Sequence, residues 1–279
     1  MARKIYAFLT LLLMGLLIPV QEAWADLTIT PIRVVFGPRD RSASVELLNL
    51  TDNTNTYRFG WLLLKATPQG RYEQVPASKV SDNDPYGVQN MIIFTPRQVT
   101  IEPHGHQIVR LSLRRPSDLP PGEYRAHLSM TRLANQETFL PHDPNAKSLD
   151  LALNANLGFS IPIIVRQGED KDLKISLSNP RLEARGKYTA LKVDINRVAG
   201  KFSSYGTVNV FWKPPKGDEK QIGTLANVAL YPELKTRPMD IPLTTTDTIK
   251  GGKIRVVYIG KLEADGITWD EKTFPVGAK

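Results

Sequence analysis

The chain has 279 residues, enough for two domains of about 100–150 residues, each with its own hydrophobic core. It contains no cysteine, which excludes disulfides and a cysteine nucleophile, so stability must come from ordinary cores. The formal net charge is +8, but the basic residues are dispersed apart from Arg110, Arg114 and Arg115, and no basic-aromatic stripe is present. We therefore do not expect nucleic-acid binding.

The first 25 residues have the pattern of a secretory signal peptide. Arg3 and Lys4 precede an apolar run over residues 5–20, and small residues at positions 23 and 25 form a cleavage signature. A run of about 16 residues is shorter than the roughly 20 that span a bilayer, although an uncleaved anchor would show a similar pattern. We expect export, a mature chain that begins at Asp26, and no stable membrane insertion.

The chain from Asp26 onward predicts β-strands, beginning with residues 27–36. Pro31 interrupts this first strand. Because proline lacks the N–H that a β-ladder needs, the strand is expected at a sheet edge with a kink. Residues 66–90 and 134–147 look irregular. Further strands are predicted at residues 43–50, 56–65, 91–94, 98–101, 107–113 and 124–133.

The most regular pattern covers residues 149–165, where every odd-numbered position is apolar and most even-numbered positions are polar or small. Because successive side chains of a strand point to opposite faces, this alternation predicts a β-strand with one buried face. At about 3.3 Å per residue the strand would span about 55 Å, well beyond a usual strand of about 5–6 residues. It is therefore expected to extend past its own domain or to offer its apolar row to another molecule.

A short polar hinge at residues 166–171 separates this long strand from a second series of strands. These are predicted at residues 173–177, 188–197, 206–212, 220–230, 237–243, 253–259 and 267–274. No segment of about twelve residues or more has helical periodicity, so both halves are expected to be all-β. About seven short strands per half predict two immunoglobulin-like β-sandwich domains, 26–168 and 169–279, although a barrel would show a similar pattern.

No constellation of residues suited to catalysis is evident in the sequence. His104 and His106 form an H-x-H pair in a glycine turn, but no third ligand is evident, and metal sites normally need three or four. The sequence contains no G-x-S-x-G nucleophile elbow, no glycine-rich phosphate loop before a helix and no distinct carboxylate pair. We expect no enzymatic activity, no cofactor and no bound metal.

Several short motifs follow one another in the first half of the chain. They are IRVVF at 32–36, FTPR at 94–97, IEPHG at 101–105, VR at 109–110 and LPPGEYR at 119–125. Together with the long alternating strand before a hinge, these motifs resemble the PapD-like periplasmic chaperones of pilus assembly, as a divergent branch of that family. The resemblance covers nearly all of the chain after residue 25 and implies two immunoglobulin-like domains joined at an angle.

The resemblance implies a role for the alternating strand, because chaperones of this class complete the unfinished sandwich of a pilus subunit by donating a strand to it. A few apolar side chains, at about 25 cal/mol per Å² of buried area, would contribute several kcal/mol. The inserted residues would be Leu149, Leu151, Leu153, Ala155, Leu157 and Phe159. Ile161, Ile163 and Val165, next to the hinge, are expected in the chain's own core. The alternative is that the whole row faces that core.

The resemblance also implies a basic anchor for the subunit's C-terminal carboxylate in the cleft between the domains, with Arg33 in the position of the family's arginine. The family's lysine falls on Pro162, so the second basic residue is expected elsewhere. Arg125 and His127 are candidates because they share one strand face. An internal salt-bridge network that sets the domain angle is implied as well. Its residues would be Arg110, Glu123 and Asp265.

The leading hypothesis is a periplasmic, non-enzymatic chaperone that binds pilus or fimbrial subunits and delivers them to an outer-membrane usher. An exported adhesion or surface-binding protein with two immunoglobulin-like domains is the alternative. A secreted carbohydrate-active enzyme is disfavoured because no carboxylate pair stands out. Exposed strand edges also invite self-association of the free chaperone.

Overall fold

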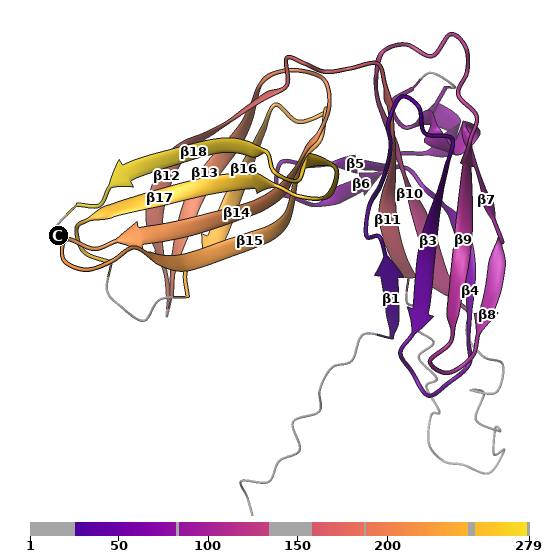
Figure 1. The fold of residues 1–279 in the computed structure, drawn as a ribbon, viewed down its shortest axis with the longest axis horizontal. Helices are drawn as coiled ribbons and strands as arrows, with labels where there is room; N and C mark the ends of the chain where they lie inside the picture. The colour runs from indigo at the N-terminus through magenta and orange to yellow at the C-terminus, as the bar shows by residue number, and fades with distance from the viewer. Residues whose placement is uncertain (1–25, 82–83, 134–157, 187, 245–248, 278–279) are drawn as a thin grey trace, which may run out of the picture.

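The computed structural model describes residues 26–81, 84–133, 158–186, 188–244 and 249–277. They form two β-sandwiches, which Figure 1 shows as two arms that meet at a steep angle. The prediction of an all-β chain with two immunoglobulin-like sandwiches is confirmed. In this described part, no helix is long and apolar enough to cross a membrane. The predicted signal peptide lies outside the described residues.

The first sandwich consists of a four-stranded sheet, in the order β1-β3-β9-β7, and a five-stranded sheet, in the order β2-β11-β10-β4-β8. Alternating apolar side chains of the two sheets meet in a single core. The strands are β1 (Leu27–Thr30), β2 (Val34–Phe36), β3 (Ser42–Asn49), β4 (Asn55–Leu62), β7 (Ile92–Thr95), β8 (Gln98–Ile101), β9 (His106–Leu113), β10 (Gly122–Arg132) and β11 (Gly158–Gln167).

The first predicted strand is divided between the two sheets of this sandwich. β1 pairs antiparallel with β3, whereas β2 pairs parallel with β11 in the opposite sheet. Pro31 follows the last residue of β1, so the predicted interruption is confirmed. The link between the two strands contains Ile32 and Arg33, and it lies where the first sandwich faces the second.

A small hairpin, β5 (Leu64–Ala66) and β6 (Tyr72–Gln74), extends from the first sandwich toward the second (Figure 1). The backbone N of Ala66 donates to Glu233 Oε1 of the second sandwich at 2.8 Å. The predicted strand over residues 56–65 includes most of β5, whereas β6 falls in the segment predicted to be irregular. The three residues of β6 are all exposed and show no alternation. The same region contains the 3-10 helices η1 (Ala77–Lys79) and η2 (Gly87–Asn90).

β11 is the described part of the long alternating strand. Ile161, Ile163 and Val165 are buried in the core of the first sandwich, as expected. Phe159 is half-buried and packs against the same core. The other predicted donor positions lie outside the described residues: Leu149, Leu151, Leu153, Ala155 and Leu157.

The second sandwich consists of a three-stranded sheet, in the order β12-β13-β16, and a four-stranded sheet, in the order β15-β14-β17-β18. β12 is longer than predicted. Its second half has no buried side chain, so no apolar alternation in the sequence marks it as a strand. The link between β11 and β12, residues 168–173, overlaps the predicted polar hinge at residues 168–171. The strands are β12 (Lys174–Arg185), β13 (Tyr188–Ala199), β14 (Ser204–Lys213), β15 (Lys220–Leu230), β16 (Thr236–Pro242), β17 (Lys253–Gly260) and β18 (Thr268–Pro275), with the 3-10 helix η4 (Leu262–Ala264) before β18.

Candidate binding site between the two sandwiches

A cavity of about 280 Å³ lies at the junction of the two sandwiches and is lined by residues of both. The first sandwich contributes the link between β1 and β2, the β5–β6 hairpin and Pro162 on β11. The second contributes residues of β14, β15 and β16 and of the link between β15 and β16, which contains Tyr231. The arginine and tyrosine side chains that line it are Arg33, Arg71, Tyr72, Tyr205, Tyr231 and Arg237. Guanidinium and hydroxyl groups donate hydrogen bonds, so a cavity lined by them suits an anionic ligand.

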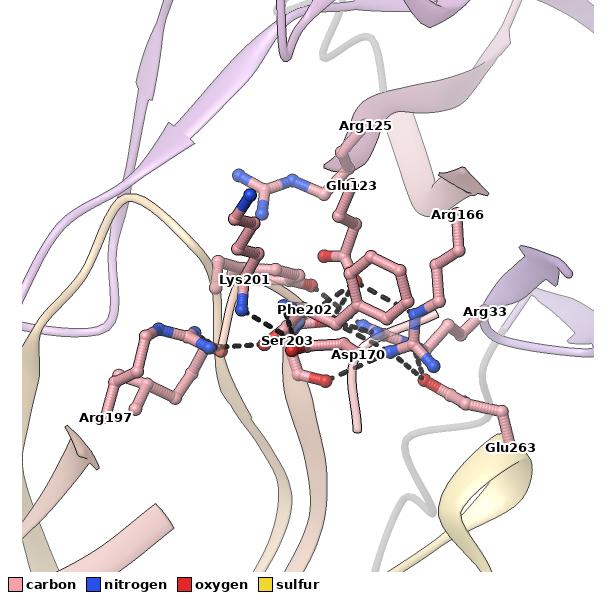
Figure 2. A network of polar contacts seen from close by, with 12 residues as sticks. Arg33, Glu123, Arg125, Arg166, Asp170, Arg197, Lys201, Phe202, Ser203 and Glu263 are labelled. Carbon is pink, nitrogen blue, oxygen red and sulfur yellow. Dashed lines mark hydrogen bonds and ion pairs between the residues drawn. The ribbon is translucent and has the colours of Figure 1, made fainter. Parts of the chain in front are cut away.

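Arg33 is buried at this cavity and is held by the second sandwich (Figure 2). Its Nε donates to Glu263 Oε1 at 2.9 Å and its Nη2 donates to Ser203 Oγ at 2.8 Å. The guanidinium also lies over the ring of Tyr205, 4.8 Å from the centroid. Burial alone lowers the pKa of Arg33, but its interactions with Tyr231, Glu263 and Glu123 together outweigh burial and raise the pKa above the ordinary value. Arg33 therefore remains charged.

Glu123 and Arg166 continue this network at the junction (Figure 2). Glu123 Oε2 accepts hydrogen bonds from Arg166 Nε at 3.0 Å and from the backbone N and Oγ of Ser203 at 3.0 and 2.9 Å. Arg166 Nη2 lies 3.6 Å from Glu263 Oε1, so Arg33 and Arg166 share that carboxylate. Separating a buried carboxylate from its hydrogen-bond donors costs free energy, because the charge is then left uncompensated away from water. The network therefore resists a change in the angle between the sandwiches.

The predicted network of Arg110, Glu123 and Asp265 is wrong in two of its three members. Arg110 is exposed on β9, because the alternation of that strand buries its two neighbours and turns Arg110 outward. Asp265 is exposed beyond the short turn η4, whereas Glu263 within that turn reaches Arg33. Glu123 lies at the junction as predicted, but its partners there are Arg166 and Ser203.

Arg125 lies on β10, two residues after Glu123, and lines a different cavity of about 490 Å³. Its Nη2 donates to Glu233 Oε1 at 2.5 Å and to the carbonyl of Leu64 at 3.0 Å. The guanidinium stacks on Tyr231, 3.6 Å from the ring centroid. In these contacts the charge of Arg125 is balanced by Glu233, and the side chain joins β10, the hairpin and the second sandwich. Arg125 is not among the residues that line the Arg33 cavity.

His127 is buried next to Tyr72, with their ring centroids 5.1 Å apart in an edge-to-face arrangement. Burial, together with the charges of Arg125 and Arg33, lowers the pKa of His127 to about 3. The imidazole is therefore neutral near pH 7. It cannot supply the second cation that the sequence analysis considered for it.

The other cations at the Arg33 cavity are Arg71 and Arg237, and neither was predicted from the sequence. Arg71 is exposed in the hairpin turn, and Arg237 on β16 donates from Nη1 to the carbonyl of Ala229 at 2.6 Å. Gly70 has φ +76°, and a Cβ there would come within 2.8 Å of Arg237 Nη2, so glycine lets the turn close over this arginine. The lysine position occupied by Pro162 was the sequence signal that a second cation lay elsewhere.

The histidine pair of the glycine turn lies at the surface. His104 Nε2 lies 3.0 Å from Asp52 Oδ1 in an exposed turn, and His106 is exposed on β9. Across the described ranges, no group of three His, Asp or Glu side chains could hold a metal ion.

Comparisons with known proteins found no matching family model and no match among curated proteins. Among solved structures, the chain is similar to the CupB2 chaperone of Pseudomonas aeruginosa, with 13% identity and a TM-score of 0.45 over 90% of this chain and 100% of that one. It is similar to the YadV chaperone, with 11% identity and a TM-score of 0.44 over 90% and 100% of the two chains. A complex of the Salmonella enterica SafA pilin with the SafB chaperone matches with 14% identity and a TM-score of 0.44 over 91% and 97%. The structures that match include periplasmic and fimbrial chaperones.

Proposed function

We propose that the chain is a periplasmic chaperone of the PapD-like class, which binds exported pilus or fimbrial subunits and has no enzymatic activity. The observation that supports this function most is a free strand edge on β11 beside the cavity that contains Arg33. The chaperone-like motifs, the predicted signal peptide and the two sandwiches at an angle agree with it.

The free edge covers residues 158–162 of β11. β10 pairs with one edge of β11 along nearly its whole length, whereas β2 pairs with the other edge only from Ile163 to Val165. No described strand pairs with the remaining part of that second edge. Its backbone groups are therefore available to a strand from another protein, in the mode called β-strand addition. In this proposal the alternating residues 149–157 extend the edge, and their apolar side chains fill the subunit's groove.

The ligand of the junction cavity, in the same proposal, is the C-terminal carboxylate of the subunit. Pro162 ends the free edge and lines the cavity together with Arg33, so a strand added along β11 would reach it. Arg33 already donates to a glutamate, so Arg237 and Arg71 supply the additional positive charge. In this proposal Arg125 and His127 stabilise the junction and do not bind the carboxylate, because Arg125 pairs with Glu233 and His127 is neutral.

The subunit complex would be delivered to an outer-membrane usher, and the free chaperone would self-associate through the same strand edge. Self-association follows from an edge that is unpaired without a subunit, and delivery to an usher is inferred from the resemblance to the chaperone class alone. Subunit binding and self-association would therefore compete, and a subunit would convert chaperone oligomers into complexes with one chaperone.

The donor strand is tested by co-expressing the full chain with a candidate exported fimbrial subunit and capturing the complex by affinity and size-exclusion chromatography. Leu153→Arg is expected to abolish capture, because it places a charge on the apolar face of the predicted strand. Asn154→Arg adds the same charge at the next position, on the opposite face, and should retain capture. Intact capture by Leu153→Arg would reject donor-strand binding and favour the adhesion protein.

The carboxylate anchor is tested with a synthetic peptide of the subunit's last residues, prepared as free acid and as amide. Arg237→Gln is expected to weaken binding of the acid about tenfold and to leave the amide unchanged, because only the acid presents a carboxylate to the guanidinium. An equal loss for both peptides would contradict the anchor while leaving the donor-strand test intact.

A further inference from the structure

Four arginines surround a third cavity, of about 500 Å³, between the turn that joins β2 to β3 and the segment that follows β9. We call it the arginine hollow, and it is lined by Pro38, Arg39, Asp40, Arg41, Leu113, Arg114 and Arg115. We propose that the arginine hollow binds a compact anion that carries phosphate groups. The proposal is independent of the chaperone function.

The two segments that form the hollow are joined by backbone hydrogen bonds. The N of Leu113 donates to the carbonyl of Arg41 at 2.8 Å, so Arg41, just before β3, lies opposite Leu113, the residue before Arg114. The β2–β3 turn is closed by two further bonds, in which Gly37 N donates to Asp40 Oδ2 at 2.7 Å and Asp40 N donates to the Gly37 carbonyl at 3.2 Å. The backbone that carries the arginines is thus fixed before a ligand binds.

The hollow contains an excess of positive charge, since four arginines surround a single aspartate. One oxygen of Asp40 already accepts the hydrogen bond from the backbone of its own turn. In the part of the chain that the structure describes, Arg39, Arg41 and Arg114 form no side-chain ion pair or hydrogen bond. Their guanidinium groups are exposed and are therefore available to a ligand from solution.

Arg115 forms the inner wall of the hollow and is only partly exposed. Its Nη1 donates to the Arg166 carbonyl at 2.9 Å and to Gln167 Oε1 at 3.1 Å, and its Nη2 donates to the Gly37 carbonyl. Its Nε is buried and has no hydrogen-bond partner among the described residues. Arg115 is therefore a positioned cation that forms no ion pair with any described carboxylate, although the charge of Asp40 partly offsets the lowering of its pKa by burial.

The chemistry of the hollow favours phosphate over other anions. Guanidinium groups match the oxygens of phosphate in pairs of parallel hydrogen bonds. A single carboxylate would compensate only one of the surplus charges, whereas a pyrophosphate or phosphomonoester carries two or more in a small volume. Roughly 300–1,000 Å³ is the usual size of a small-molecule pocket, so the hollow fits a compact ligand. The phosphate can belong to a soluble molecule or to a lipid headgroup.

The proposal is tested by isothermal titration of the purified full chain with inorganic pyrophosphate. We expect saturable binding that the double variant Arg39→Gln/Arg114→Gln weakens at least tenfold. The matched control is Arg58→Gln/Arg97→Gln, which removes the same charge from exposed positions of the same sandwich and should retain affinity within about twofold. Circular dichroism of both double variants checks that they fold.

A second measurement distinguishes the source of the phosphate. Sedimentation with phosphatidylcholine vesicles that contain phosphatidic acid supports a lipid headgroup if Arg39→Gln/Arg114→Gln abolishes it, and pyrophosphate binding without vesicle binding supports a soluble ligand. Three outcomes overturn the proposal: no saturable pyrophosphate binding, an equal loss in the control double variant, or a triglutamate peptide that binds more tightly than pyrophosphate.

Discussion

The junction between the sandwiches and the arginine hollow both gather arginines, but their charges are compensated in opposite ways. At the junction, Arg33, Arg125 and Arg166 each lie within 3.0 Å of a glutamate oxygen. In the hollow, no described arginine forms an ion pair. Buried cations need such partners because they have lost their hydration, whereas exposed cations keep theirs until a ligand replaces it. The junction charges therefore fix geometry, and the hollow charges remain available for binding.

Removal of Glu123 is expected to produce the largest loss of stability. Glu123→Ala leaves Arg166 and two donors of Ser203 without their acceptor at a buried site. Loss of one partner of a buried ion pair costs about 3–5 kcal/mol, and we expect the free energy of unfolding to fall by about that amount in urea denaturation. Glu123→Gln retains an acceptor for Ser203 and should lose less. Equal losses in the two variants would exclude a contribution from the charge.

A smaller effect is expected from His127, and it depends on pH. Burial, then the charges of Arg125 and Arg33, lowers its pKa to about 3, whereas an unfolded histidine titrates near 6.5. As the pH falls below about 6.5, the unfolded state takes up a proton that the folded state does not, so stability decreases by about 1.4 kcal/mol per pH unit down to about pH 3.

The His127→Gln variant isolates this contribution. Between pH 7 and pH 5 the variant should lose about 2 kcal/mol less unfolding free energy than the wild type, because only the wild type has the imidazole. Urea denaturation at the two pH values measures the difference. Identical pH dependence in both proteins would show that the buried imidazole titrates near its ordinary value.

Most of the fold could be predicted from the sequence, because a half-buried strand leaves a period-two pattern in its residues. The described part of the alternating stretch, residues 158–165, and the break at Pro31 are examples, and both agree with the described strands. The β5–β6 hairpin could not be predicted in this way. Its strands have three residues each, and those of β6 are all exposed, so no alternation marks them.

The candidate site was predictable only in part, because its contacts join residues far apart in the chain. Arg33 followed from a motif resemblance, but its partner Glu263 is 230 residues away and no pattern in either segment records the contact. Glu233 and Ser203 are comparable cases, since each becomes a partner only when the second sandwich packs against the first. Arg110 was assigned wrongly because the assignment followed its place in a motif and not the face of β9 on which it lies, which is the exposed face.

A surface ion pair is intermediate between the buried pairs of the junction and the unpaired arginines of the hollow. Arg255 Nε donates to Glu219 Oε1 at 3.0 Å, and both side chains are about one-third exposed. Exposed pairs contribute about 0–1 kcal/mol, so Glu219→Ala should lower the free energy of unfolding by less than about 1 kcal/mol. The loss should shrink further in 1 M salt, because salt screens exposed charges. A loss as large as that of Glu123→Ala would remove the distinction between junction and surface pairs.

The smallest effect on stability is expected in the arginine hollow. Arg39→Gln/Arg114→Gln removes two like charges that form no ion pair in the described structure, so no favourable contact is lost. The free energy of unfolding should change by less than about 0.5 kcal/mol, and at low salt the change should be a gain because like charges repel. Urea denaturation at low and high salt measures both the size and the sign, and the gain should vanish as salt screens the repulsion. A loss above 1 kcal/mol would mean that these arginines stabilise the fold as the junction arginines do, and the contrast between the two regions would then fail.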